Sequence, residues 1–146
     1  MKDIVEAGKP NQPFFLQLYV NKDRSKSEKV LQNARDLGIK AILVTVDAPV
    51  PGKREADERS STTMKIVSAN SGSVSKNDKK GGGIGRQLGS YIDSTLCWDD
   101  VKWIKETSGL PVVLKGVQTA RDAQLAVKYG CDGVFISNHG GRALDT

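Results

Sequence analysis

Four short, almost continuously apolar segments alternate with helical patterns along this chain, and this alternation is the strongest constraint on its fold. Polar residues do not alternate with the apolar ones inside these segments, as they would in a half-exposed strand, so we expect strands that are covered on both faces. Strands that alternate with helices predict parallel β/α units. The predicted strands are Phe14–Val20, Ala41–Val46, Pro111–Lys115 and Gly133–Ser137.

Three helices are predicted between these strands. The first lies within residues 25–38, with Ser25 as its N-cap and a glycine as its stop. The second lies within residues 98–109, and the third lies within residues 119–130 and has Thr119 as its N-cap. Because such connections are right-handed, an open doubly wound sheet and a barrel remain as the two main folds. The apolar faces of the second and third helices are predicted to hold Trp98, Val101, Ile104, Ala123, Ala126 and Val127.

A long polar segment, about residues 50–93, interrupts the alternation. It is rich in serine, glycine, asparagine and lysine, and we expect a flexible loop. Residues 53–86 contain eight lysines or arginines and four acidic residues, which is +4 of the net charge of +5. Because the excess lies in a polar loop and not along a folded face, nucleic-acid binding is disfavoured. GGGIGRQLG in this segment lacks the third glycine and the preceding strand of a dinucleotide-binding fingerprint.

Metal binding and membrane insertion are not indicated by the sequence. Cys97 and Cys131 together with the single histidine, His139, do not have a metal-ligand spacing, so we expect no metal site and two reduced, partly buried thiols. The start of the chain has no apolar core of the signal-peptide kind. No apolar run approaches the length of about 20 residues that a membrane span needs.

Polar residues stand at or just beyond the end of every predicted strand, where the active residues of parallel β/α folds gather. Asp47 can hold and charge-stabilise the imidazole of His139, which makes that ring a competent base. Arg142 and Arg54 can clamp a carboxylate, and Lys115 can stabilise developing negative charge. Such a site suits proton abstraction from, or oxidation of, a small hydroxy or keto acid. The full set at the strand ends is Gln17, Tyr19, Asn21, Thr45, Asp47, Lys115, Gly116, Ser137, Asn138, His139 and Arg142.

Each of these residues also has an ordinary structural interpretation. A lone histidine in a loop is often structural, and a lysine at the end of a strand is usually solvated. Asp47 stands before Ala-Pro and can be a turn residue. Their coincidence at one end of one predicted sheet favours a site.

Four stretches of the chain resemble the FMN-dependent L-2-hydroxy-acid dehydrogenases and oxidases, a family that includes cytochrome-linked L-lactate dehydrogenase, glycolate oxidase and lactate oxidase. These stretches occur in family order. The resemblance implies an α/β fold of the TIM-type (β/α)8 barrel class, in which this chain covers about strands 3 to 6. It also implies that residues 1–146 form a partial FMN hydroxy-acid dehydrogenase domain. The matching stretches are QLYVNKDR (17–24), VTVDAPVPGKRE (44–55), LPVVLKGVQTARDA (110–123) and SNHGGRALD (137–145).

The resemblance also implies roles for particular residues. His139 would be the active-site base, paired with Asp47, and Tyr19 would hydrogen-bond the substrate. Arg54 and Arg142 would bind the substrate carboxylate. Gln17, Thr45 and Lys115 would contact FMN, and Lys115 would stabilise negative charge on the reduced flavin.

The partners and the compartment follow from the same resemblance. The leading expectation is oxidation of L-lactate to pyruvate with electrons passed to cytochrome c, in a homo-oligomer located in the mitochondrial intermembrane space. A glycolate or 2-hydroxy-acid oxidase that uses oxygen, peroxisomal or cytoplasmic, is the alternative. Because four of eight strands leave two open sheet edges, an inactive half-barrel fragment or scaffold is a further alternative.

Overall fold

The fold is built on a four-stranded parallel sheet, seen in a computed structural model that describes residues 1–50, 66–67, 74–75 and 89–141. The order of the strands across the sheet, β1-β2-β5-β6, is also their order along the chain. All neighbours in this sheet pair in parallel, with Gln17 opposite Leu43 and Thr45 opposite Lys115. Sequential parallel order is the arrangement of a (β/α)8 barrel, whereas a doubly wound sheet reverses its strand order part-way. The strands are β1 (Phe15–Leu18), β2 (Ala41–Thr45), β5 (Val112–Val117) and β6 (Gly133–Ile136).

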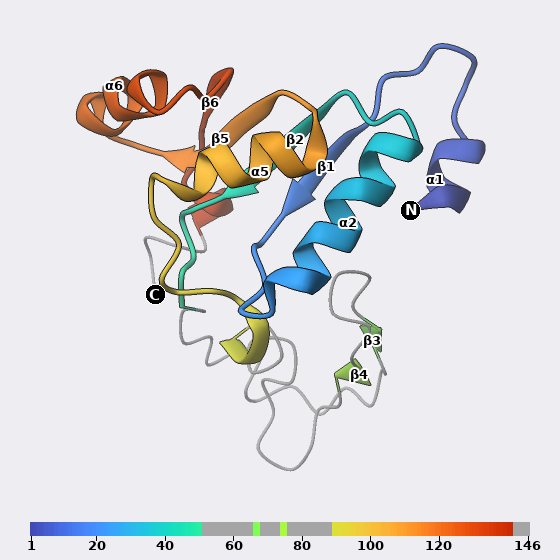
Figure 1. The fold of residues 1–146 in the computed structure, drawn as a ribbon, viewed down its shortest axis with the longest axis horizontal. Helices are drawn as coiled ribbons and strands as arrows, with labels where there is room; N and C mark the ends of the chain where they lie inside the picture. The colour runs from blue at the N-terminus through green and yellow to red at the C-terminus, as the bar shows by residue number, and fades with distance from the viewer. Residues whose placement is uncertain (51–65, 68–73, 76–88, 142–146) are drawn as a thin grey trace.

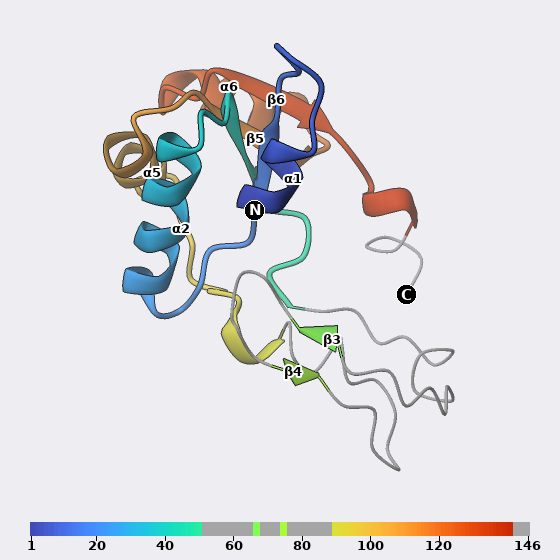
Figure 2. The same ribbon diagram turned by 90° about the vertical axis from the view of Figure 1, so that its right-hand side faces the viewer.

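Three helices cover one face of this sheet. In Figures 1 and 2, α2 (Arg24–Asp36) and α5 (Asp100–Ser108) lie side by side on the same side of the strands. The third, α6 (Ala120–Lys128), packs on β5 and β6. Each helix therefore follows one strand and precedes the next, as the sequence predicts. The other elements are α1 (Lys2–Glu6), the antiparallel pair β3 (Ile66–Val67) and β4 (Val74–Ser75), and a 3-10 turn, η1 (His139–Gly141).

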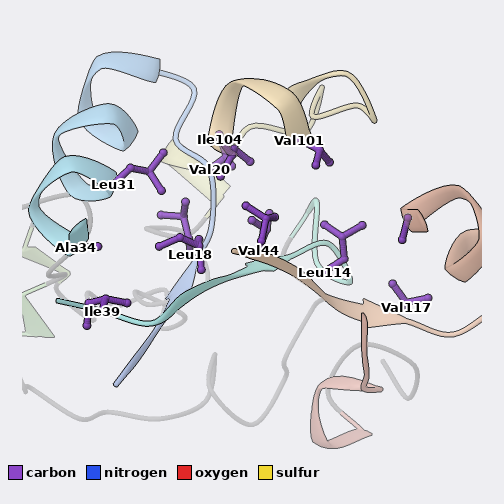
Figure 3. Close-up of a cluster of buried hydrophobic side chains, with 13 residues drawn as sticks. Leu18, Val20, Leu31, Ala34, Ile39, Val44, Val101, Ile104, Leu114 and Val117 are labelled. Atoms are coloured by element: carbon purple, nitrogen blue, oxygen red, sulfur yellow. The ribbon is translucent and has the colours of Figure 1, made fainter. Parts of the chain in front are cut away.

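The hydrophobic core fills the space between the sheet and these helices. Figure 3 shows Leu31 of α2 and Ile104 of α5 facing Leu18 and Val44 of the strands. These four side chains are at most 1% exposed. Full burial of side chains of this size contributes about 1.5–3 kcal/mol each. This core fixes β1, β2 and β5 relative to one another and so positions the residues at their carboxyl ends.

The predicted helices are present, but some predicted details are wrong. Asp23, and not Ser25, is the N-cap of α2, because the Asp23 carboxylate accepts hydrogen bonds from the Ser25 backbone N–H (3.2 Å) and hydroxyl (2.7 Å). Trp98 lies before α5 and stacks on the Tyr129 ring. Val127 is 76% exposed, since no element within the described ranges covers that side of α6. The Thr119 cap of α6 is confirmed.

The last strand of the sheet is open on both faces. Val134 lies opposite Leu114, on the helix side, and Phe135 lies opposite Lys115, on the other side. Both are exposed, at 39% and 49%, and Ile136 is 80% exposed. The expectation of strands covered on both faces therefore holds for β2. It fails for β1, where Phe15 and Gln17 are exposed, and for β6, which lacks a following β/α unit among the described residues.

Residues 91–93, at the end of the predicted flexible loop, pack against the end of β1. The backbone N–H of Asp93 donates to the Val20 carbonyl, and that of Lys22 donates to the Tyr91 carbonyl, both at 2.8 Å. Arg24 pairs with the buried Asp93 carboxylate at 2.7 Å. Much of the predicted loop lies outside the described residues. No helix in the described part of the chain combines the length and the apolarity that a membrane crossing requires.

Candidate active site

A histidine, an aspartate and a tyrosine from three different strand ends meet on the face of the sheet that the helices leave open. Tyr19 follows β1, Asp47 follows β2 and His139 follows β6. The Nδ1 atom of His139 lies 2.7 Å from Asp47 Oδ1, and its Nε2 atom lies 3.1 Å from the Tyr19 hydroxyl. A carboxylate only accepts hydrogen bonds, so Nδ1 carries the proton of a neutral ring and Nε2 keeps its lone pair. This arrangement leaves Nε2 as the basic atom of the site.

The Asp47 carboxylate lies between the imidazole of His139 and the ammonium group of Lys115. Its side chain is only 3% exposed. Oδ1 accepts from His139, and Oδ2 lies 3.6 Å from Lys115 Nζ, which makes an ion pair. A buried carboxylate is costly unless it is paired in this way. Asp47 can therefore stabilise positive charge that develops on the imidazole.

The backbone after β6 presents the histidine. His139 has φ +61°, a left-handed conformation that is uncommon for residues other than glycine. The Ser137 hydroxyl accepts a hydrogen bond from the His139 backbone N–H at 3.0 Å, and two glycines, also at positive φ, follow. These features turn the chain at the strand end so that the ring reaches across toward β1.

A second group of polar side chains lies next to the histidine, along neighbouring strands. The Gln17 amide Nε2 donates to the Thr45 hydroxyl at 2.7 Å, and Lys115 stands opposite Thr45 on β5. Gln17 is exposed, Thr45 is buried and Lys115 is intermediate. Two neutral hydrogen-bonding groups and one cation at adjacent strand ends suit a planar heterocycle that carries polar edge atoms and can become negatively charged.

The structure brings six of the eight predicted site residues together. Arg54 and Arg142, the predicted carboxylate ligands, lie outside the described residues. The structure adds the docking of residues 91–93 beside the segment that follows β1 and contains Tyr19. The apolar pair Tyr91-Ile92 after a long polar stretch is the signal in the sequence that an ordered element resumes there. The residues brought together are Gln17, Tyr19, Thr45, Asp47, Lys115 and His139.

Comparison with known proteins identifies the family. The FMN-dependent dehydrogenase family matches residues 1–146. This chain belongs to that family. It is 40% identical over 149 residues to a 2-hydroxyacid oxidase of Dictyostelium discoideum, and the match covers 100% of this chain and 38% of that protein. It is 42% identical over 146 residues to an L-lactate dehydrogenase (cytochrome) of Wickerhamomyces anomalus, covering 98% and 24%.

A solved member of the family agrees with the fold described above. The crystal structure of a lactate oxidase of Pediococcus acidilactici is similar with a TM-score of 0.77 at 32% identity, covering 99% of this chain and 37% of that one. This chain thus spans about a quarter to two fifths of the length of these relatives. The expected family, the expected cofactor of the family, FMN, and the partial (β/α)8 barrel are confirmed.

Proposed function

We propose that this chain contributes the proton-transfer residues of an FMN-dependent enzyme that oxidises an L-2-hydroxy acid. The placement of His139 between Asp47 and Tyr19, beside Lys115, is the observation that carries the proposal. Oxidation of a 2-hydroxy acid to a 2-keto acid removes two protons, one from the hydroxyl group and one from C2, together with two electrons. A base and a group that balances its charge are therefore needed where the hydroxyl binds.

In this proposal His139 Nε2 accepts the proton of the substrate hydroxyl. Asp47 keeps the ring oriented through Nδ1 and stabilises the imidazolium that forms, because it is buried and only 2.7 Å away. The Tyr19 hydroxyl, 3.1 Å from Nε2, is placed to hydrogen-bond the same substrate oxygen. Arg54 and Arg142 are proposed to bind the substrate carboxylate by bidentate contacts.

The residues at the strand ends fit the flavin. FMN, when bound, supplies the two-electron acceptor for the oxidation. Gln17 and Thr45 offer an amide and a hydroxyl on adjacent strands, and Lys115 offers a positive charge that is only partly neutralised by Asp47 at 3.6 Å. We propose that Gln17 and Thr45 hydrogen-bond the ring edge and that Lys115 balances negative charge there.

L-lactate is the proposed substrate and cytochrome c the proposed electron acceptor. Identity of 42% with an L-lactate dehydrogenase (cytochrome) supports this version, which suits a mitochondrial intermembrane location. Identity of 40% with a 2-hydroxyacid oxidase supports the alternative, in which oxygen accepts the electrons and the location is peroxisomal or cytoplasmic. Reoxidation separates the two: reduced flavin protein that transfers electrons to cytochrome c and reacts slowly with oxygen supports the first version.

A second candidate function is a non-enzymatic half-barrel scaffold. The observation that favours it is the open sheet face, where Phe15 and Phe135 are 59% and 49% exposed. A homo-oligomer, or further strands of a longer protein, would cover this face and the two sheet edges. A scaffold needs no flavin, so flavin binding distinguishes the two functions.

The test is FMN retention by the purified chain. The chain is incubated with FMN, freed of excess flavin, and its visible spectrum is recorded before and after anaerobic addition of L-lactate. Lys115→Met should weaken FMN binding roughly tenfold or more, because it removes a charged contact. Lys102→Met is the matched control, since Lys102 is 80% exposed on α5. Equal FMN affinity of the wild type and Lys115→Met would contradict the assigned role of Lys115, and no bound flavin at all would favour the scaffold.

A further inference from the structure

The proposal concerns Gly116, which follows the flavin-site lysine on β5. The pairing of β5 with β6 shifts register between Lys115 and Val117, so Gly116 forms a β-bulge. Its φ is +104°, a conformation that residues with a side chain rarely adopt. Bulges often re-aim a neighbouring side chain next to an active site. Here the bulge lies directly beside Asp47.

The space next to Gly116 is filled by the Asp47 side chain. A Cβ atom at position 116 would lie 2.5 Å from Asp47 Cβ, 2.6 Å from its Cγ and 2.7 Å from Oδ2. Ordinary van der Waals contact begins at 3.4 Å, so the shortfall at Asp47 Cβ is about 0.9 Å. Rotation about χ1 of Asp47 cannot remove this clash, because Cβ is fixed to the backbone. The backbone of residue 47 or of residue 116 would have to move.

We propose that Gly116 is a positioning residue for the Asp47–His139 pair. Without a side chain at position 116, Asp47 approaches β5 closely enough for Oδ2 to reach Lys115 (3.6 Å) while Oδ1 accepts from His139 at 2.7 Å. A displacement of about 0.9 Å is at least as large as the whole range of donor–acceptor distances over which a hydrogen bond of this kind exists. Any side chain at position 116 therefore breaks or lengthens the contact that holds the base. The catalytic role of the Asp47–His139 pair rests on the proposed function. The effect of Gly116 on the position of the Asp47 carboxylate does not depend on it.

Other glycines of the chain provide matched controls. Gly38 and Gly130 also have positive φ, +74° and +77°, but a Cβ at either position would have nothing within 4 Å. Alanine there introduces the conformational strain without the clash. Because φ is +104° at Gly116 and +77° at Gly130, the strain is greater at Gly116, and the His139 ring signal rather than the loss of stability reports the contact with Asp47.

The experiment uses nuclear magnetic resonance of the imidazole in the 146-residue chain. His139 is its only histidine, so ¹⁵N-histidine labelling gives unambiguous ring signals. The wild type should show an Nδ1-protonated ring with a downfield, hydrogen-bonded Nδ1 proton. Gly116→Ala should lose that signal or shift it upfield while the far-ultraviolet circular dichroism is kept, and Gly130→Ala should keep it. Wild-type ring signals in Gly116→Ala, or equal loss in both variants, would overturn the proposal.

A second variant covers the case in which Gly116→Ala does not fold. Asp47→Gly removes all three atoms that the new methyl group would meet. If the clash is the cause, Gly116→Ala should fold in the Asp47→Gly background and cost less stability there than it does beside Asp47. Failure of the double variant to fold, with Asp47→Gly alone folded, would overturn the proposal. Because neither readout requires flavin or substrate, failure here is distinguishable from failure of the proposed function.

Discussion

The substitution Asp93→Asn tests how residues 91–93 are held beside the segment that follows β1 and contains Tyr19. Asp93 Oδ2 pairs with Arg24 at 2.7 Å, and Oδ1 accepts from the Thr95 backbone N–H at 2.9 Å and from its hydroxyl at 2.6 Å. Asparagine retains one acceptor oxygen for Thr95 but turns an amide toward the guanidinium of Arg24. The variant therefore removes the charged hydrogen bond to Arg24 and leaves Thr95 bonded to a neutral acceptor.

The expected loss of unfolding free energy follows from this geometry. A hydrogen bond to a charged group is worth about 1.5–3 kcal/mol. The lower part of that range applies, because Arg24 is 32% exposed and keeps Asp100 at 3.2 Å and the Trp103 ring at 4.7 Å. A loss of about 1.5–2 kcal/mol changes the unfolding equilibrium constant roughly 10- to 30-fold. Urea denaturation followed by tryptophan fluorescence measures it, since Trp103 stacks on Arg24.

The pH dependence gives an independent check. Hydrogen bonding from Thr95, together with the positive charge of Arg24, holds the pKa of the Asp93 carboxyl below its usual value of 3.8. A carboxyl whose pKa is lowered by folding contributes stability at pH values above its unfolded-state pKa, and that contribution disappears as the pH falls through the folded-state pKa. The difference between the wild type and Asp93→Asn should therefore be constant near neutral pH and should shrink below about pH 4.

Asp36→Asn is the control, because Asp36 pairs with Arg35 at 3.4 Å and is 67% exposed. It should cost less than about 0.5 kcal/mol. The reasoning is refuted if Asp93→Asn costs no more than Asp36→Asn, or if the difference between the wild type and Asp93→Asn grows as the pH falls.

Two further predictions concern the thiols and the activity of the chain. Cys97 should be alkylated by iodoacetamide faster than Cys131, because Cys97 is exposed. Burial raises the pKa of the Cys131 thiol, so less of it is thiolate at a given pH. Equal alkylation rates measured by mass spectrometry would contradict this prediction. The purified 146-residue chain should show no robust dye reduction with L-lactate, because its four strands leave one sheet face open; rapid reduction would show that the site assembles from this chain alone.

Much of the fold was predictable because its signals are local. Continuous apolar runs indicate β1 and β2, and the Thr119 cap indicates the start of α6. The predictions fail where two local signals compete, or where residues distant in the sequence determine the local structure. Asp23 and Ser25 are both good N-caps, and only the path of the chain after β1 selects the aspartate. The exposure of β6 depends on which element lies next to it, which its own sequence does not specify.

The topology of the sheet made it possible to predict which residues lie close together in the candidate site. The geometry of their contacts was not predictable. Carboxyl ends of parallel strands share one edge of a sheet, so Asp47 and His139 are expected near one another although 92 residues separate them. Which ring nitrogen meets the carboxylate depends on the left-handed turn at His139. The signal for the close approach at Gly116 is present in the sequence, since an isolated glycine within a strand pattern marks a bulge or a close approach.

The contact between Tyr19 and His139 joins residues that follow the first and the last strand of the sheet. β1 and β6 are the two outer strands of the sheet and are separated by three strand spacings, about 14 Å in a flat sheet. Yet the Tyr19 hydroxyl and His139 Nε2 lie 3.1 Å apart. The length of the tyrosine side chain and the left-handed turn that places His139 beyond the end of β6 together bridge that gap. The packing of α2, α5 and α6 on the sheet fixes the strands from which both side chains extend, so the core as well as the hydrogen bonds positions the His139 ring.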